Sequence, residues 1–419
     1  MEGILIILIN MLLYLVKGNI IKINFHKENY MSSYHIDNVF FSKIVTNDFS
    51  FGTPAYPITL DISTDSPYFV VKGATSPNEY KQENSTSFYF VKFGHSYEYK
   101  NIYFHSIFFN EDFILNDRII TLNSMMYWSK YPITHSYGLI GLQLYDNKFQ
   151  EKNIFINQLY DKGLIANKMF SLVYKNENKG ELIIGDFPSG KTELLKGKKF
   201  KMCKNNFKSD GIVYGTNFEE IKFIDINLIF KNIKANDLNY TVIFSNTYYG
   251  YIGSQAYNNF IYETFFKLKL INKSCWTQNI DNDRYYGYVC SKRVDMSSIP
   301  NIKLYHKELN FTFEIENKDM WIKHKNIKYF LVFFSHIEQF WWTLGQKFLE
   351  KYTFVFNGEQ NIIGFYYDDK IIKNTRLYIY IILYLLLIII IAICIRFVFL
   401  YHSNRNKKIE EGVELEETF

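Results

Sequence analysis

Two serine-containing turns, each at the end of an apolar strand, are the places in this chain where side chains could carry out chemistry. Ile62 to Ser66 form the first turn and Phe244 to Tyr248 form the second, with Ser63 and Ser245 in matching places. A serine hydroxyl acts as a nucleophile when a histidine base, itself held by a carboxylate, removes its proton. Neither turn has a nearby histidine in sequence or a Gly-x-Ser-x-Gly elbow, so both serines are interpreted as turn residues.

Carboxylates are distributed unevenly around these turns. Asp61 lies two residues before Ser63, hence on the same face of a strand, and Asp65 follows Ser63 in the turn. Between Tyr240 and Ile280 the sequence contains no aspartate. Acid–base chemistry with two carboxylates needs one group to take a proton while the other gives one. The first turn therefore offers nearby carboxylates, and the second turn offers no aspartate.

A mainly β chain must position the two turns. Short alternating or apolar runs, broken by Gly, Asn and Asp, predict the strands. They include Phe88 to Phe93, Phe170 to Tyr174, Glu181 to Ile184 and Tyr352 to Phe356. The stretches that favour helices are Ile154 to Lys162, Ser254 to Leu270 and Gln346 to Glu350. Each serine turn is followed later by an apolar strand that ends in Gly, at Leu139-Ile140-Gly141 and Thr343-Leu344-Gly345. This internal duplication predicts a bilobal or double-barrel β architecture.

Charge and metal-binding patterns exclude several function classes. The 47 basic and 42 acidic side chains leave a formal net charge of +5 without a basic stripe, so we expect no nucleic-acid partner. No CxxC pair and no HExxH motif occurs, and the nine histidines are scattered. We therefore expect no metal site and no cofactor.

The four cysteines favour an oxidising compartment. Cys394 falls in an apolar segment, which leaves Cys203, Cys275 and Cys290 outside it. Cys275 and Cys290 are close enough in sequence to close a small loop, and we predict a disulfide between them. Candidate N-glycosylation acceptors, compatible with a secreted surface, are Asn84, Asn239, Asn272 and Asn310.

Two apolar segments predict the topology. Residues 1–18 have the length of a signal peptide, with an uncleaved anchor as the alternative. From Leu377 to Ile395 there is no charge, and apolar character resumes up to Leu400, so Leu377 to Leu400 are predicted to span a membrane. Basic residues after this span place residues 401–419 in the cytosol. The expectation is a single-pass type I protein of the secretory pathway or cell surface, with a lumenal or extracellular ectodomain.

The ectodomain resembles the pepsin-like aspartic proteases, and a membrane-tethered member of this kind is most similar to the plasmepsins. Phe51 to Val71, FGTPAYPITLDISTDSPYFVV, is similar to the family's first signature, in which Gly-Thr-Pro precedes a strand and an Asp-Thr-Gly-Ser turn. Further segments match in the family's order. These are Tyr137 to Leu142, Phe155 to Ile165, Met169 to Tyr174, Gly180 to Asp186, Met296 to Ile302, Trp342 to Phe356 and Ile362 to Tyr366. Cys275 and Cys290 resemble the disulfide of the family's C-terminal lobe.

The resemblance implies a bilobal pepsin-like fold with a groove between the lobes. It places a short pro or linker segment at residues 19–37, the N-terminal lobe at 38–190 and the C-terminal lobe at 191–370. The family's reaction needs two aspartates that share one proton across a water molecule.

The same resemblance implies that this chemistry is lost. Ser63 and Ser245 stand at the two aspartate positions, with Asp65 and Thr247 at the turn glycines. Phe93 stands at the flap tyrosine and Val70 at its tryptophan partner. Gln346 stands where an aspartate usually follows Leu-Gly.

Three functions are compatible with this pattern. The leading hypothesis is a membrane-anchored pseudoprotease that binds a polypeptide in the groove between the lobes. One alternative is an active aspartic endopeptidase that uses Asp61 or Asp65 with an unrecognised partner. Another is a structural surface protein of a membrane complex.

Overall fold

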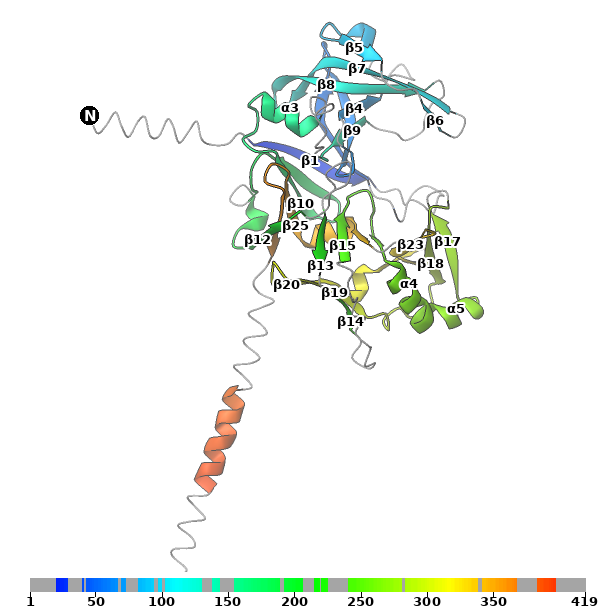
Figure 1. Ribbon diagram of the computed structural model, residues 1–419, viewed down its shortest axis with the longest axis vertical. Coiled ribbons are helices and arrows are strands. Elements are labelled where there is room, and N and C mark those ends of the chain that lie inside the picture. The colour runs from blue at the N-terminus through cyan, green and yellow to red at the C-terminus, as the bar shows by residue number, and fades with distance from the viewer. Residues whose placement is uncertain are drawn as a thin grey trace, which may run out of the picture. The chain divides into compact units, whose positions relative to one another are not determined.

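The computed structural model describes most of the expected ectodomain and a short part of the C-terminal segment (Figure 1). The described residues are 20–28, 40, 43–66, 69–72, 82–93, 97–99, 102–129, 138–143, 154–188, 192–205, 215–218, 220–224, 240–280, 283–337, 341–367 and 383–396. They belong to two compact units, residues 1–196 with 200–366 and residues 197–199 with 367–419. The expected signal peptide and cytosolic tail lie outside the described residues.

The second unit contains a helix at residues 383–396, inside the segment that the sequence predicts to span a membrane. The rest of that segment lies outside the described residues. Among the helices that are described, none is both long enough and apolar enough to cross a bilayer.

The first unit is mainly β, as the sequence predicts, and its largest sheet has 14 strands. Their order is β12-β26-β25-β10-β11-β1-β2-β3-β9-β4-β8-β7-β5, and β6 also pairs with β7. The strands are β1 (Ile21–Glu28), β2 (Lys43–Phe51), β3 (Tyr56–Ser63), β4 (Phe69–Lys72), β5 (Tyr89–Phe93), β6 (Tyr97–Tyr99), β7 (Ile102–Leu115), β8 (Arg118–Ser129), β9 (Gly138–Gly141), β10 (Met169–Asn176), β11 (Lys179–Ile184), β12 (Lys199–Lys204), β25 (Thr353–Asn357) and β26 (Ile362–Tyr367).

Two further sheets are built from the second half of the chain. A nine-stranded sheet has the order β13-β15-β24-β16-β23-β18-β22-β21, with β17 paired to β18, and a three-stranded sheet has the order β14-β19-β20. The strands are β13 (Gly215–Phe218), β14 (Glu220–Ile224), β15 (Tyr240–Phe244), β16 (Tyr251–Ile252), β17 (Cys275–Ile280), β18 (Tyr285–Ser291), β19 (Asn301–His306), β20 (Phe311–Ile315), β21 (Trp321–His324), β22 (Ile327–Phe330), β23 (Val332–Ser335) and β24 (Trp342–Leu344).

The α-helices described in the first unit are short, and they lie in or overlap the three stretches that the sequence favours. They are α3 (Phe155–Asp161), α4 (Gln255–Ile261), which continues through the π-helical η5 (Tyr262–Phe266) into α5 (Lys267–Ile271), and α6 (Gln346–Lys351). Single 3-10 turns occur at η2 (Gln82–Asn84), η4 (Glu193–Leu195) and η6 (Asn317–Asp319).

The predicted duplication appears as a repeated strand arrangement. In the first half β3 pairs in parallel with β9, β9 in antiparallel with β4, and β4 in parallel with β8. In the second half β15 pairs in parallel with β24, β24 in antiparallel with β16, and β16 in parallel with β23. Each serine turn therefore follows the first strand of one repeat, and each Gly-ending strand is its parallel neighbour.

The expected linker at residues 19–37 contains strand β1, which lies inside the large sheet. Ile21, Ile23 and Phe25 are buried and alternate with more exposed residues, as in a strand with one face on the core. β1 pairs with β11 on one side and with β2 on the other. The expected lobe boundary at residues 190–191 lies between β11 and β12, which belong to the same sheet.

The predicted disulfide is confirmed, since Cys275 and Cys290 are bonded directly across the β17–β18 pair. Cys203 is buried in β12. Of the candidate glycosylation acceptors, Asn84, Asn272 and Asn310 are exposed, and Asn239 lies outside the described residues.

Truncation of a buried β1 side chain tests whether this strand is a structural part of the sheet. Ile23→Ala removes a fully buried side chain and should lower the free energy of unfolding by about 2 to 5 kcal/mol. Asn24→Ala, at the exposed neighbouring position, is the matched control and should cost less than about 1 kcal/mol. Denaturant unfolding measures both. Equal effects would show that β1 is not integral to the fold.

Candidate functional site

The first serine turn is closed by its own side chain. Ser63 ends β3, and its Oγ accepts a hydrogen bond of 3.1 Å from the backbone N–H of Asp65. The carbonyl oxygen of Ser63 accepts from the backbone N–H of Leu142, which follows β9, at 2.8 Å. A hydroxyl that bonds the N–H two residues later is a common turn device of serine. This arrangement holds the turn at the end of two parallel strands.

The second turn repeats the arrangement. Ser245 follows β15, and its Oγ accepts from the backbone N–H of Thr247 at 3.2 Å. Its own N–H donates to the carbonyl oxygen of Leu344 in β24 at 3.1 Å. Each serine thus closes its own turn and hydrogen-bonds to the parallel neighbouring strand or the residue after it.

Thr64 and Asn246, the residues after the serines, bind each other in a reciprocal way. The backbone N–H of Thr64 donates to Oδ1 of Asn246 at 2.8 Å, and the backbone N–H of Asn246 donates to Oγ1 of Thr64 at 3.1 Å. Nδ2 of Asn246 also donates to the carbonyl oxygen of Ile62 at 2.6 Å. Both side chains are buried, so these bonds satisfy backbone groups that water does not reach. The two turns are joined by this pair.

Asp65 reaches from the first turn to the second. Its Oδ2 accepts a short hydrogen bond of 2.5 Å from Oγ of Ser245, and its Oδ1 lies 3.0 Å from Oγ1 of Thr64. The carboxylate thus contacts hydroxyl groups of both turns. Hydrogen bonds from hydroxyls to ionised acceptors are shorter and stronger than those between neutral groups.

Asp61 does not take part in this contact. Its Oδ2 lies 3.3 Å from Nζ of Lys43 in β2, and its buried Oδ1 has no hydrogen-bond partner. Burial raises the pKa of Asp61 to about 6; the positive charge of Lys43 opposes this shift and nearby Glu28 adds to it. Of the two aspartates that the sequence offers as substitutes, Asp65 and not Asp61 is therefore hydrogen-bonded to Ser245.

The number of carboxylates at the two turns limits the acid–base chemistry that is possible there. In the hydrogen-bonded network that the described residues form here, Asp65 is the one carboxylate, and both of its oxygens face hydroxyl groups. One carboxylate cannot supply a base and an acid at the same time. In the part of the chain that the structure covers, no group of three or more His, Cys, Asp or Glu side chains is arranged to hold a metal ion.

A comparison with protein families identifies the fold that carries these turns. The family model described as eukaryotic aspartyl protease matches residues 46–366, from β2 to the end of the first unit. The chain belongs to this family. A search of curated proteins found no match. The matched range includes both serine turns, so the aspartyl protease fold holds Ser63 and Ser245 in the places described above.

The structure also describes the other residues that the resemblance singles out. Phe93, predicted at the flap position, lies in β5 with 78% of its surface exposed and its ring 5.0 Å from that of Phe90. Val70 is buried in β4. Gln346 begins α6 and is fully buried, with its side chain beside the buried hydroxyl of Tyr174.

Sequence reasoning missed the pairing of Thr64 with Asn246. The signal was present, because both residues directly follow the matched serines and both carry a side-chain oxygen. Their contact nevertheless joins positions 182 residues apart, and the turn sequences do not reveal which groups meet.

Substitution of Asn246 tests the importance of the reciprocal pair. Asn246→Ala leaves the buried N–H of Thr64 and the carbonyl of Ile62 without these partners, and should lower the free energy of unfolding by about 3 kcal/mol. Asn246→Thr keeps a side-chain acceptor and should cost about half as much. Asn259→Ala, at an exposed position of α4, is the control for chemical denaturation. A loss in Asn246→Ala no larger than in this control would contradict the role of the pair.

The raised pKa of Asp61 predicts that acid stabilises the folded chain. This carboxyl group titrates at 3.8 when unfolded and at about 6 when folded, so between these pH values the unfolded state releases its proton first. Stability therefore falls as the pH rises through this window, by at most about 3 kcal/mol, and changes little outside it. Asp61→Asn should remove this dependence and be more stable than wild type at neutral pH. Urea denaturation over this range measures both, and an unchanged profile in the variant would assign the effect to another group.

Proposed function

We propose that this chain is a membrane-anchored, non-catalytic aspartyl-protease-like protein that binds an extended polypeptide. The observation that carries the proposal is the contact between Ser245 and Asp65. It supports a site in which one carboxylate and two serine hydroxyls replace the two carboxylates that the family's reaction requires.

Loss of catalysis is supported by what each side chain at the turns already does. Ser63 and Ser245 both accept a backbone N–H of their own turn, and Ser245 donates its hydroxyl proton to Asp65. A hydroxyl at the second aspartate position does not ionise near neutral pH and cannot act as the second acid or base. The contacts that hold the turns are kept, while the pair of titrating groups is not.

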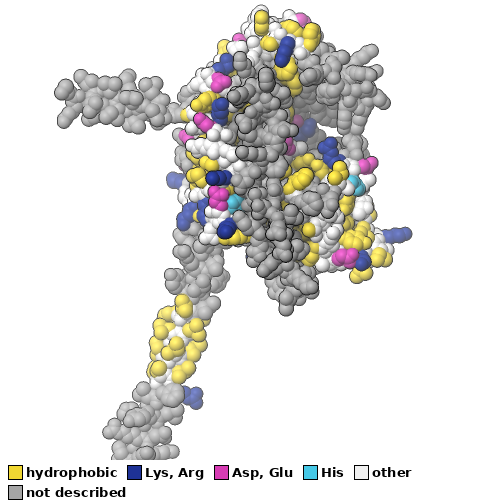
Figure 2. Space-filling view, viewed as in Figure 1, with side chains coloured by type: hydrophobic (Ala, Val, Ile, Leu, Met, Phe, Trp, Pro, Cys, Tyr) yellow, Lys and Arg dark blue, Asp and Glu magenta, His cyan; other side chains and the backbone are white. Residues whose placement is uncertain are grey.

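Polypeptide binding is supported by the exposed strand β5. Among the described strands β5 pairs with β7 alone, so one of its edges is available for strand pairing. Four of its five residues are exposed large hydrophobics: Tyr89, Phe90, Val91 and Phe93. Figure 2 shows hydrophobic side chains at the end of the molecule where β5 lies in Figure 1. An apolar edge strand is a site at which an extended peptide can add by backbone hydrogen bonds.

Membrane anchoring is supported by the C-terminal segment Leu377 to Leu400. Its described part, at residues 383–396, is helical, and Arg396 is the one charged residue in that part. The helix is rich in Leu and Ile, a composition that suits the hydrocarbon core of a bilayer.

A second candidate function is residual endopeptidase activity through Asp65. The contact of 2.5 Å with Ser245 favours it, because it brings a carboxylate to the place of the missing second aspartate. Under this alternative a water molecule would have to be activated by one carboxylate and a serine hydroxyl.

A combined test separates the two candidates. The purified full-length chain and Asp65→Asn are incubated with a peptide library from acidic to neutral pH, with and without a transition-state-mimicking inhibitor of aspartic proteases. We expect no cleavage by either. Inhibitor-sensitive cleavage that Asp65→Asn abolishes would establish the second candidate instead.

Binding is measured on the same library by affinity capture and titration. The double substitution Phe90→Ser and Phe93→Ser should weaken peptide binding about tenfold, because each ring loses apolar contact area. Ile119→Ser removes another exposed apolar side chain, from β8, and should leave binding unchanged. A folded chain that captures no peptide would refute the proposed function.

A further inference from the structure

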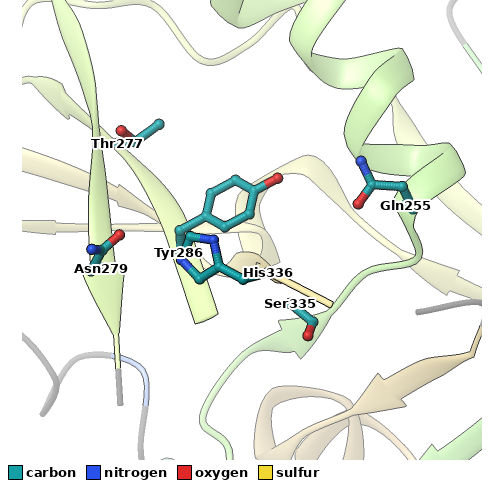
Figure 3. Close-up of a pocket in the computed structure, with 6 residues that line it drawn as sticks. All are labelled: Gln255, Thr277, Asn279, Tyr286, Ser335 and His336. Carbon is teal, nitrogen blue, oxygen red and sulfur yellow. The ribbon is translucent and has the colours of Figure 1, made fainter. Parts of the chain in front are cut away.

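A polar pocket of about 600 Å³ opens in the second half of the chain, between the β17–β18 pair and the start of α4 (Figure 3). Six described residues from four elements and their ends line it: Gln255, Thr277, Asn279, Tyr286, Ser335 and His336. None of the six is Asp, Glu, Lys or Arg. The proposed peptide site on β5 does not include any of them.

Two side-chain amides offer acceptors to this pocket. Nε2 of Gln255 donates to Oδ1 of Asn259 at 3.1 Å, and Nδ2 of Asn279 donates to Oδ1 of Asp283 at 2.7 Å. One N–H of each amide is therefore engaged with a neighbour, while the second N–H and the oxygen, Oε1 of Gln255 or Oδ1 of Asn279, can bind a ligand. Figure 3 shows these two residues on opposite sides of the pocket, one on the helix and the other on the strand.

Two hydroxyl groups offer donors. The hydroxyl oxygen of Tyr286 accepts from Nδ2 of Asn258 at 2.7 Å, while Oδ1 of Asn258 is occupied by the hydroxyl of Tyr288 at 3.0 Å. The proton of Tyr286 is left to donate, and burial raises the pKa of this phenol, which keeps the proton in place. Oγ of Ser335 accepts from the backbone N–H of Ile337 at 3.1 Å, so its proton is also left to donate.

Two aromatic rings form one side of the pocket. The rings of Tyr286 and His336 lie 4.8 Å apart with an interplanar angle of 41°, side by side in Figure 3. The hydroxyl of Thr277 lies on the same strand face as Asn279. The pocket thus combines ring surface with separate donors and acceptors that converge from several directions.

We propose that this pocket binds a neutral saccharide. Each sugar hydroxyl can donate one hydrogen bond and accept two, and hydroxyls project from all sides of the ring, which suits acceptors and donors on four different elements. The C–H face of a sugar packs on aromatic rings as other apolar groups do. A phosphate or carboxylate ligand would find no cationic Lys or Arg among the lining residues described. A planar carboxamide would reach only part of the donor and acceptor set.

The test titrates the full-length chain with methyl glycosides of hexoses and N-acetylhexosamines and with their short oligomers. The chain is purified in a detergent without a sugar headgroup, and binding is followed by saturation-transfer NMR and calorimetry. Parallel samples are treated enzymatically to remove N-glycans. Binding seen only after this treatment would mean that a glycan of the chain itself fills the pocket, which supports the site and identifies the source of the saccharide.

Substitution of the pocket amides tests whether the saccharide binds in this pocket. The double variant Gln255→Ala and Asn279→Ala removes both acceptors and should weaken saccharide binding at least about tenfold. Gln278→Ala removes an amide from the next position of β17, whose side chain points to the other face, and should leave the affinity unchanged. The proposal is overturned if the folded chain binds no glycoside either before or after removal of its N-glycans. It is also overturned if the Gln255→Ala and Asn279→Ala double variant binds like wild type. Preference for a primary carboxamide such as N-acetylasparagine amide would also overturn it.

Discussion

The reciprocal hydrogen bonds between Thr64 and Asn246 are the contact on which the rest of the site depends. Each side chain accepts the buried backbone N–H of the other residue, so neither turn can satisfy its own backbone without the partner turn. The two strand repeats are thereby held in one relative position at this point. The places of Ser63, Asp65 and Ser245 follow from it, because each is adjacent to a member of the pair.

Each serine closes its own turn with its hydroxyl group. Oγ of Ser63 accepts the N–H of Asp65, and Oγ of Ser245 accepts the N–H of Thr247. Two carboxylates that share a site repel each other and share a proton, whereas neutral hydroxyls carry no such electrostatic cost. The carboxyl group of Asp65 adds an acceptor beside these hydroxyls, and Ser245 donates its proton to it.

Local sequence patterns predict much of this fold but not its long-range contacts. The mainly β character, the duplication and the Cys275–Cys290 bond all follow from short-range signals, namely alternation, repeated motifs and spacing. Strand β1 has a clear alternation of buried residues, yet its partner β11 lies far along the chain, and alternation reveals a face rather than a neighbour. The sequence does not predict the direction of the Asp65 side chain either, because that direction depends on where the second turn lies.

Gln346 shows that backbone packing, rather than side-chain chemistry, maintains the frame of the second turn. A Cβ on the preceding Gly345 would lie 2.0 Å from the carbonyl oxygen of Gly250 and 2.4 Å from that of Tyr248. The backbone N–H of Gln346 donates to the carbonyl oxygen of Tyr248 at 2.7 Å. This hydrogen bond fixes the position of Gln346 independently of its side chain. Backbone constraints of this kind, which do not depend on side-chain chemistry, hold the frame of the aspartyl protease fold that the chain matches over residues 46–366.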